Sequence, residues 1–287
     1  MLISIAMSAS APLFPAVFSL TAMAIWGASD FFGGVGSRRA NAFLFTSVVH
    51  LSGVALMVSV ATLMREAFPS RISVLWAVAA GSIGGISLAI FYRALASGKM
   101  GLTAPVSAVL SAGIPTIITA FSEGFPGYRH LAGFVLAGIG VWLISRTENE
   151  SGHPEGVGWA VVAGVGFAGF YLCIHQAGDA SAVWLATCSR LASLIVTGIF
   201  VLAGRQLRTL PRPVLGIAIF TGFLDVSGTV LFVRAAQIGR LDNAVVLSSL
   251  YPAVTVLLAR FFLHEHFSPG RTVGMLAALL AVPMIAG

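Results

Sequence analysis

Four ionisable side chains stand inside long apolar stretches of this 287-residue chain: Asp30, His50, Arg190 and Asp225. A charged side chain at the centre of a membrane helix costs about 2.5–3.5 kcal/mol on insertion scales, so each group needs a partner or a purpose. Arg190 and Asp225 lie on successive stretches, which predicts either a buried ion pair or a contact with a charged solute. Asp30, His50 and Asp225 are candidates for proton coupling, although a carrier that runs down its substrate gradient needs none. For His50, a histidine hydrogen-bonded between helices is the commoner case.

Aromatic side chains with polar neighbours accompany two of the apolar stretches. Trp26 and Asp30 lie in the first stretch, and Tyr171 and His175 lie in the sixth. Together they could form a wall of a cavity for an organic solute. Taken singly, Trp26 or Tyr171 is more often a core residue or an interface anchor. Asp30 either belongs to this wall or lies near the headgroups, within reach of the two arginines that follow it.

Motifs for hydrolysis, nucleotide binding or metal binding are absent from the sequence. It contains neither a Gly-x-Ser-x-Gly elbow nor a Walker A loop. His264, Glu265 and His266 are adjacent, whereas zinc proteases need His-Glu-x-x-His so that both imidazoles share one helix face. We therefore predict no metal, no cofactor and no enzymatic activity. An intramembrane hydrolase with His50 or His175 as base stays an alternative without a supporting motif.

The composition indicates an integral membrane protein. Hydrophobic residues make up 57% of the chain and charged residues only 9%, against about 25% charged in soluble domains. The net charge of +6 suits loops that lie against anionic headgroups, and no basic run with interleaved aromatics indicates nucleic acid binding. Both cysteines, Cys173 and Cys188, fall in apolar stretches, so no disulfide framework is expected.

The apolar stretches are long enough to cross a hydrocarbon core of about 30 Å, and their continuity favours helices over a barrel. We predict an all-α integral membrane protein with ten transmembrane helices. Their ranges are 12–36, 42–64, 72–97, 102–121, 128–146, 155–177, 181–203, 213–237, 242–262 and 269–286.

A segment of the third stretch returns in the second half of the chain. Phe91, Arg93, Ala94 and Gly98 reappear in register as Phe232, Arg234, Ala235 and Gly239, and Gly81 matches Gly222 at the same offset. A constant offset near half the chain length indicates an internal repeat. Because each repeat holds an odd number of spans, the two copies enter the membrane from opposite sides. We expect two inverted five-helix repeats, 1–148 and 149–287.

Proline and hydroxyl side chains mark the fourth and ninth stretches, which are equivalent in the two repeats. A proline frees a backbone carbonyl, and sites in inverted-repeat transporters lie on helices interrupted at corresponding positions. Such residues are also common in packed membrane helices. The candidate binding residues from these stretches and the third are Tyr92, Ser107, Ser111, Ser248, Ser249 and Tyr251, with Pro105, Pro115 and Pro252 as the interruptions.

The doubled five-helix unit resembles the ten-helix EamA-type members of the drug/metabolite transporter superfamily. The end of the third stretch, Tyr92 to Leu95, looks like one family signature. The segment from Pro252 to Glu265, followed by a glycine-rich last stretch, looks like another. The first copy departs from it, with Leu110 in place of the proline.

This resemblance implies a secondary transporter in a bacterial inner membrane. It would export small metabolites by alternating access around a midplane cavity. The expected substrates are aromatic or large apolar amino acids. A drug, sugar or nucleotide-sugar carrier is the runner-up. The expected partners are a small-molecule substrate and the lipid bilayer. The sequence sets no oligomeric state, and a monomer fits it.

The orientation is predicted from the basic residues between the stretches. Ten of them fall on the side opposite the chain termini and five on the side of the termini. The positive-inside rule therefore favours termini outside the cytoplasm, whereas similar transporters often have cytoplasmic termini.

Overall fold

Every regular element in the described part of the chain is a helix. The computed structural model describes residues 13–97, 100–122, 124–125, 127–145, 156–264 and 269–286. The first half holds α2 (Leu13–Ser37), α3 (Ala42–Leu63), α4 (Arg71–Ser97), α5 (Met100–Ser122) and α6 (Tyr128–Ser145). The second half holds α7 (Val157–Gln176), α8 (Ala182–Ala203), α9 (Arg212–Ile238), α10 (Leu241–Ser248), α11 (Tyr251–Phe262) and α12 (Pro269–Ala286).

Eight segments of the described residues are long and apolar enough to cross a membrane. They are α2, α3, α4, α5, α7, α8, α9 and the α10–α11 segment. The protein is therefore a multi-pass integral membrane protein. Helices α6 and α12, of 18 residues each, coincide with the fifth and tenth predicted spans, whose crossing of the membrane stays a prediction. The predicted boundary between the repeats, at 148 and 149, lies outside the described residues.

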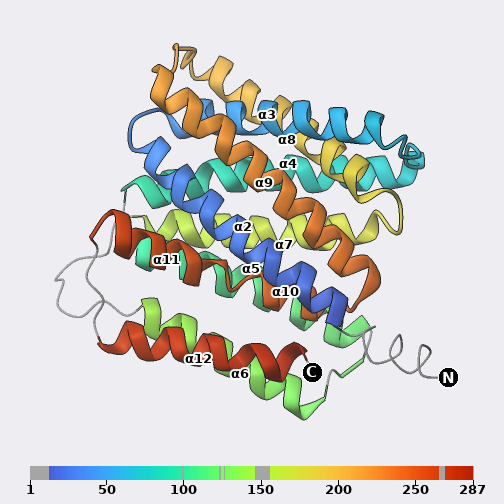
Figure 1. Ribbon diagram of the computed structural model, residues 1–287, viewed down its shortest axis with the longest axis vertical. Helices are drawn as coiled ribbons and strands as arrows, with labels where there is room; N and C mark the ends of the chain where they lie inside the picture. The colour runs from blue at the N-terminus through green and yellow to red at the C-terminus, as the bar shows by residue number, and fades with distance from the viewer. Residues whose placement is uncertain are drawn as a thin grey trace.

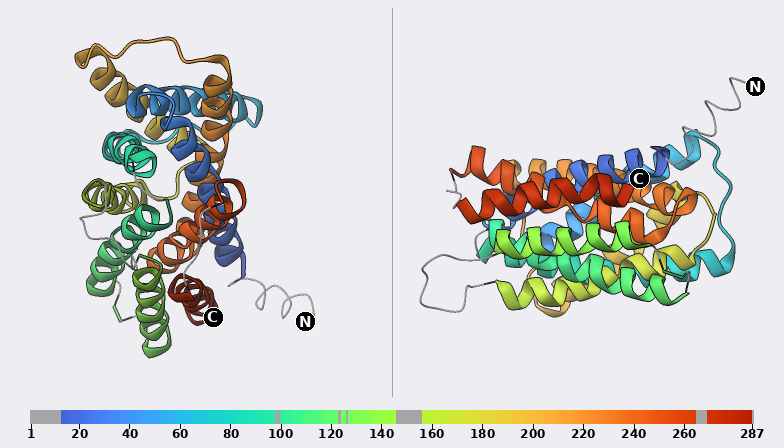
Figure 2. Two further views of the ribbon diagram at one scale, coloured as in Figure 1. Left: turned by 90° about the vertical axis from the view of Figure 1, so that its left-hand side faces the viewer. Right: turned by 90° about the horizontal axis from the view of Figure 1, so that it is seen from below.

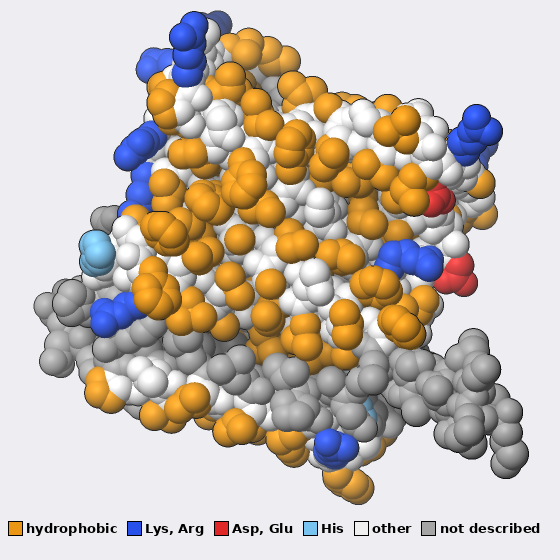
Figure 3. Space-filling model, in the orientation of Figure 1, with side chains coloured by type: hydrophobic (Ala, Val, Ile, Leu, Met, Phe, Trp, Pro, Cys, Tyr) orange, Lys and Arg blue, Asp and Glu red, His pale blue; other side chains and the backbone are white. Residues whose placement is uncertain are grey.

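The helices lie side by side in one bundle (Figure 1). Helices α3 and α8 occupy one end of its long axis, and α6 and α12 form a pair at the other end, as the perpendicular views in Figure 2 also show. Hydrophobic side chains cover most of the visible face, and lysines and arginines gather at its left and right edges (Figure 3). This distribution suits a bilayer core between two polar interfaces.

Helix packing follows a reciprocal pattern between the two halves. Helix α2 packs against α9, and α4 packs against α7; likewise α3 contacts α9 and α4 contacts α8. The α10–α11 segment lies against α2, as α5 lies against α7. Exchanging each helix for its counterpart in the other half maps every one of these contacts onto another.

Two glycines at matching positions of the repeated sequence permit close approach in two of these helix contacts. A Cβ atom built on Gly81 of α4 would lie 1.9 Å from the carbonyl oxygen of Ser189 in α8. One built on Gly222 of α9 would lie 2.2 Å from the carbonyl oxygen of Val49 in α3. Neither position can hold a larger residue without separating the helices, which is how small residues act in membrane interfaces.

The predicted ninth span is broken and the predicted fourth span is not. Helix α10 ends at Ser248, and α11 begins at Tyr251 with Pro252 in its first turn. Because Pro252 has no N–H, the carbonyl oxygen of Ser248 loses its acceptor role in the helix. Helix α5 carries Pro105 and Pro115 but runs unbroken from Met100 to Ser122. The predicted interruption of the fourth span is therefore wrong.

Candidate functional site

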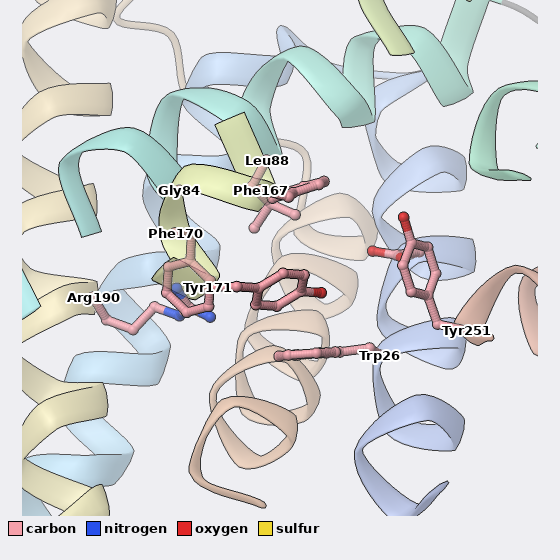
Figure 4. Close-up of a pocket in the computed structure, with 9 residues that line it drawn as sticks. Trp26, Gly84, Leu88, Phe167, Phe170, Tyr171, Arg190 and Tyr251 are labelled. Atoms are coloured by element: carbon pink, nitrogen blue, oxygen red, sulfur yellow. The ribbon is translucent and has the colours of Figure 1, made fainter. Parts of the chain in front are cut away.

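A cavity of about 50 Å³ lies at the centre of the bundle (Figure 4). This volume holds a few water molecules, since one water needs about 10–15 Å³. Five helices contribute to its lining. The residues are Trp26 and Asp30 from α2, Gly84 and Leu88 from α4, Phe167, Phe170 and Tyr171 from α7, Arg190 from α8, and Tyr251 from α11.

Aromatic rings make up most of the cavity wall, and rings behind them hold it in place. Trp26 and Tyr171 both contact Phe232 of α9, at ring-centroid distances of 5.5 and 4.8 Å. Phe167 and Tyr251 both contact Phe91 of α4, at 5.6 and 6.2 Å. Phe91 and Phe232 are fully buried, and they are the two phenylalanines of the repeated segment. The repeated segment therefore supports the cavity wall from behind.

Arg190 and Asp225 form the ion pair that their positions on successive helices predicted as one alternative. Arg190 Nε lies 2.8 Å from Asp225 Oδ2, and Nη2 donates to Oδ1 at 3.2 Å. Nη2 also contacts the hydroxyl of Thr229, one turn further along α9. Both charged side chains are at most 7% exposed. The guanidinium faces the ring of Phe170 at 5.8 Å, at one side of the cavity in Figure 4.

The indole of Trp26 ties this pair to α2. Its Nε1 donates a hydrogen bond of 3.1 Å to the backbone carbonyl oxygen of Asp225. The neighbouring Ser29 lies 3.3 Å from the hydroxyl of Tyr92 and also donates to the carbonyl oxygen of Thr221. One face of α2 is thereby fixed to both α4 and α9. Tyr92 is fully buried beside the cavity and does not line it.

Two polar groups in the lining have no such partner. Asp30 is 7% exposed and has no hydrogen bond or ion pair with any described residue. It does not pair with the arginines at 38 and 39, so its place is the cavity rather than the headgroup region. The hydroxyl of Tyr251, 3% exposed, makes no well-formed hydrogen bond among the described residues, although Ser107 lies within interaction range of it. Figure 4 shows Tyr251 on the side opposite Arg190.

Neither predicted histidine is among the residues that line this cavity. His50 is fully buried in α3, and neither ring nitrogen has a hydrogen-bond partner among the described residues. His175 lies near the end of α7, beside a surface hollow that Asp179 also lines. The position of His175 therefore argues against a place for it in the central lining.

None of the four serines predicted as binding residues is among the residues that line the central cavity. Ser111 and Ser248 donate to carbonyl oxygens of their own helices, those of Ala108 and Ala244. The Ser107 hydroxyl is buried and makes no well-formed hydrogen bond among the described residues. Ser249 lines a separate, mostly apolar cavity of about 180 Å³ between α5, α6 and α10. The hydroxyl of Ser249 lies within interaction range of Tyr171, at the boundary of the central cavity.

Sequence reasoning missed four lining residues: Gly84, Leu88, Phe167 and Phe170. One of them had a usable signal. The offset that relates Phe91 to Phe232 also relates Trp26 to Phe167 and Asp30 to Tyr171. Applying the repeat offset to the polar and aromatic residues of α2 would have found Phe167. Leu88 and Phe170 are ordinary apolar residues, and no pattern separates them from the core.

Metal binding finds no support within the described ranges, where no group of three histidine, cysteine or carboxylate side chains could hold an ion. Glu265 and His266 of the sequence motif lie outside those ranges.

Comparison with known proteins finds a family match in the second half of the chain. Residues 154–287 match the EamA-like transporter family. A solved structure titled "Crystal structure of protein" is similar to 94% of this chain and 95% of its own, with 17% sequence identity and a TM-score of 0.70. At this identity the likeness shows a shared fold. A search of curated proteins found no match.

Proposed function

We propose that this protein is a secondary transporter that exports a small organic solute by alternating access around the central cavity. The observation that carries the proposal is the cavity itself. It lies in the middle of membrane-spanning helices from both halves, and it combines aromatic walls with ionisable groups. The EamA-like domain in residues 154–287 supports a general role in transport.

The reciprocal contacts of the two halves favour an inverted repeat around this cavity. The pair Trp26 and Phe232 has a centroid distance of 5.5 Å, and its counterpart under the repeat, Phe167 and Phe91, has 5.6 Å. Related positions of α2 and α7 thus face the same cavity from two sides. In such a fold one half rocks against the other while the site stays central.

Movement is required because the cavity is smaller than an amino acid. A volume of about 50 Å³ admits a few water molecules, so substrate entry needs the walls to separate. The break between α10 and α11 lies beside Tyr251, which lines the cavity. The break interrupts the backbone hydrogen bonds of the helix, so the α10–α11 segment bends at a lower free-energy cost. We propose that this segment moves when the cavity opens.

Amino acids with aromatic or large apolar side chains are the leading substrates within this proposal. The rings of Trp26, Phe167 and Tyr171 offer an apolar surface, and Asp30 offers a site for an amino group. A nucleotide-sugar carrier would need an uncompensated cation for phosphate. The lining cation, Arg190, is already paired with Asp225, which disfavours that alternative.

The hydrolase alternative loses support at His50. A serine hydrolase needs a base hydrogen-bonded to its nucleophile, and neither nitrogen of His50 has a partner among the described residues.

Transporter function is tested by reconstituting the purified protein in proteoliposomes loaded with labelled phenylalanine or leucine. We expect efflux above that of protein-free liposomes. The absence of flux under every substrate and proton gradient would contradict the proposal.

We also propose that the protein lies in a bacterial inner membrane with its termini outside the cytoplasm. Arg39, Arg205 and Arg208 come together around one polar hollow at a single end of the bundle. A concentrated basic surface of this kind marks the cytoplasmic side under the positive-inside rule.

A further inference from the structure

The cavity holds one carboxylate that has no countercharge. Asp30 lines the cavity, is 7% exposed, and has no hydrogen-bond or ion-pair partner among the described residues. Buried charges in membrane helices are normally paired. Asp30 is therefore a site that can accept a cation from outside the protein.

The lining arginine does not serve as that countercharge, because its guanidinium is paired with Asp225. Arg190 contacts both carboxylate oxygens of Asp225, at 2.8 and 3.2 Å, and also Thr229. When all three groups are ionised, Asp30, Arg190 and Asp225 together carry one net negative charge. A substrate carboxylate that approached Arg190 would meet a pair that is already neutral, with the Asp30 carboxylate in the same cavity lining. One added positive charge would balance the group.

The rest of the lining suits an organic cation. An ammonium group donates up to three hydrogen bonds and is attracted to the faces of aromatic rings. The Tyr251 hydroxyl is buried without a well-formed hydrogen bond among the described residues, and its oxygen can accept one of these bonds. Trp26, Phe167 and Tyr171 supply ring surface for the cation and its apolar body. Figure 4 shows Tyr251 facing Tyr171 across the cavity, above Trp26.

We propose that Asp30 binds the protonated amino group of the substrate, and that the substrate class of this cavity is monocationic organic amines with an apolar body. A carboxylate on the substrate is not recognised, so an amine binds more tightly than the amino acid of the same skeleton. This inference rests on the proposed transport function and narrows it. It replaces recognition of a whole amino acid with recognition of its ammonium group and its apolar side chain.

Three ligands with one phenyl skeleton test the inference on the detergent-solubilised protein. They are 2-phenylethylamine, phenylalanine and 3-phenylpropionate, which carry an amine, both groups, and a carboxylate, respectively. We expect calorimetry to give the order 2-phenylethylamine, then phenylalanine, with no binding of 3-phenylpropionate. Tighter binding of phenylalanine or 3-phenylpropionate than of 2-phenylethylamine would overturn the inference, as would no binding of the amine.

The variant Asp30→Asn keeps the size of the side chain and removes its charge. We expect the dissociation constant for 2-phenylethylamine to rise at least about 30-fold, as when one partner of a buried charge pair is removed. The control Asp179→Asn changes an exposed carboxylate and leaves the affinity unchanged. Unchanged affinity in Asp30→Asn would overturn the inference. If this variant does not fold, the order of affinities of the three ligands for the wild-type protein decides the case. The second variant is then Tyr251→Phe, which removes the proposed hydrogen-bond acceptor and should weaken the binding of 2-phenylethylamine. The exposed Tyr128→Phe is its control.

Flux measurements separate this inference from the transport proposal. Proteoliposomes that export phenylalanine but neither bind nor export 2-phenylethylamine would leave the transporter standing and remove the amine class. Export of 2-phenylethylamine that is lost in Asp30→Asn and kept in Asp179→Asn supports both. Binding of the amine without flux of any solute would contradict transport and support the binding site.

Discussion

The indole of Trp26 donates to the backbone carbonyl oxygen of Asp225, at 3.1 Å, and so joins two helices far apart in the sequence. Trp26 lines the cavity, and Asp225 holds Arg190. The bond therefore fixes the position of α2 relative to the ion pair between α8 and α9. It also orients the indole face that forms part of the wall. Ser29 adds a second side-chain hydrogen bond between the same two helices, to the carbonyl oxygen of Thr221.

Replacing Trp26 with phenylalanine tests that attachment while keeping an aromatic wall. Loss of one buried hydrogen bond is expected to lower stability by about 1 kcal/mol. We expect a lower thermal unfolding temperature in detergent and slower efflux from proteoliposomes. Trp76→Phe, on the exposed side of α4, is the control and should match the wild type in both assays. Equal behaviour of the two variants would show that the indole N–H has no such role.

The ion pair is tested by removing one partner and then both. Arg190→Met leaves the Asp225 carboxylate buried and unpaired, and we expect a loss of about 3–5 kcal/mol in unfolding free energy. The double variant Arg190→Met with Asp225→Leu is expected to recover most of that loss, because apolar residues can replace a buried pair. Stability is measured by denaturant unfolding in detergent. A double variant no more stable than Arg190→Met would contradict this account.

The same double variant decides between the two roles that the sequence left open for this pair. If the pair is structural, the double variant is expected to keep substrate transport, because Asp30 is still present to bind the substrate. A variant that folds like the wild type and has lost all flux would instead assign the pair to substrate binding.

The helical elements were predictable because each apolar stretch must satisfy its own backbone hydrogen bonds in lipid. The predicted range 42–64, for example, corresponds to α3 at Ala42–Leu63. The break before Pro252 followed from the missing N–H. Pro105 and Pro115 have the same chemistry, yet α5 stays continuous. Composition cannot tell these outcomes apart, since neighbouring helices decide whether a freed carbonyl is tolerated.

The site was predictable only in part. Trp26, Asp30, Tyr171, Arg190 and Tyr251 meet at one cavity, and the sequence had marked all five. Helix rotation was the missing information. Ser111 and Ser248 face carbonyl oxygens of their own helices, where they satisfy their hydroxyls locally. His175 lies one helical turn beyond Tyr171, near the end of α7, and this distance along the axis takes it out of the cavity.

Close contact between α3 and α9 depends on Gly222. A Cβ atom there would lie 2.0 Å from Ser52 Oγ and 2.2 Å from the Val49 carbonyl oxygen. We expect Gly222→Ala to lower stability by about 1–3 kcal/mol, because the backbones must separate. Gly216→Ala, on the same helix with nothing within 4 Å of its Cβ, is the matched control and should be neutral or slightly stabilising. Comparable unfolding temperatures for both variants would contradict this close approach.

The orientation is tested with single cysteines in two loops that are expected on opposite sides of the membrane. Thr209 is exposed beside the basic hollow, and Ser70 is exposed in the loop at the far end of α3. In a background with Cys173 and Cys188 changed to alanine, a membrane-impermeant maleimide is applied to spheroplasts and to inside-out vesicles. Because the basic end is expected in the cytoplasm, Thr209→Cys should react in inside-out vesicles and Ser70→Cys in spheroplasts. The reverse pattern would place the termini in the cytoplasm. Reaction of both from one side would contradict the arrangement of α3 and the loop after α8.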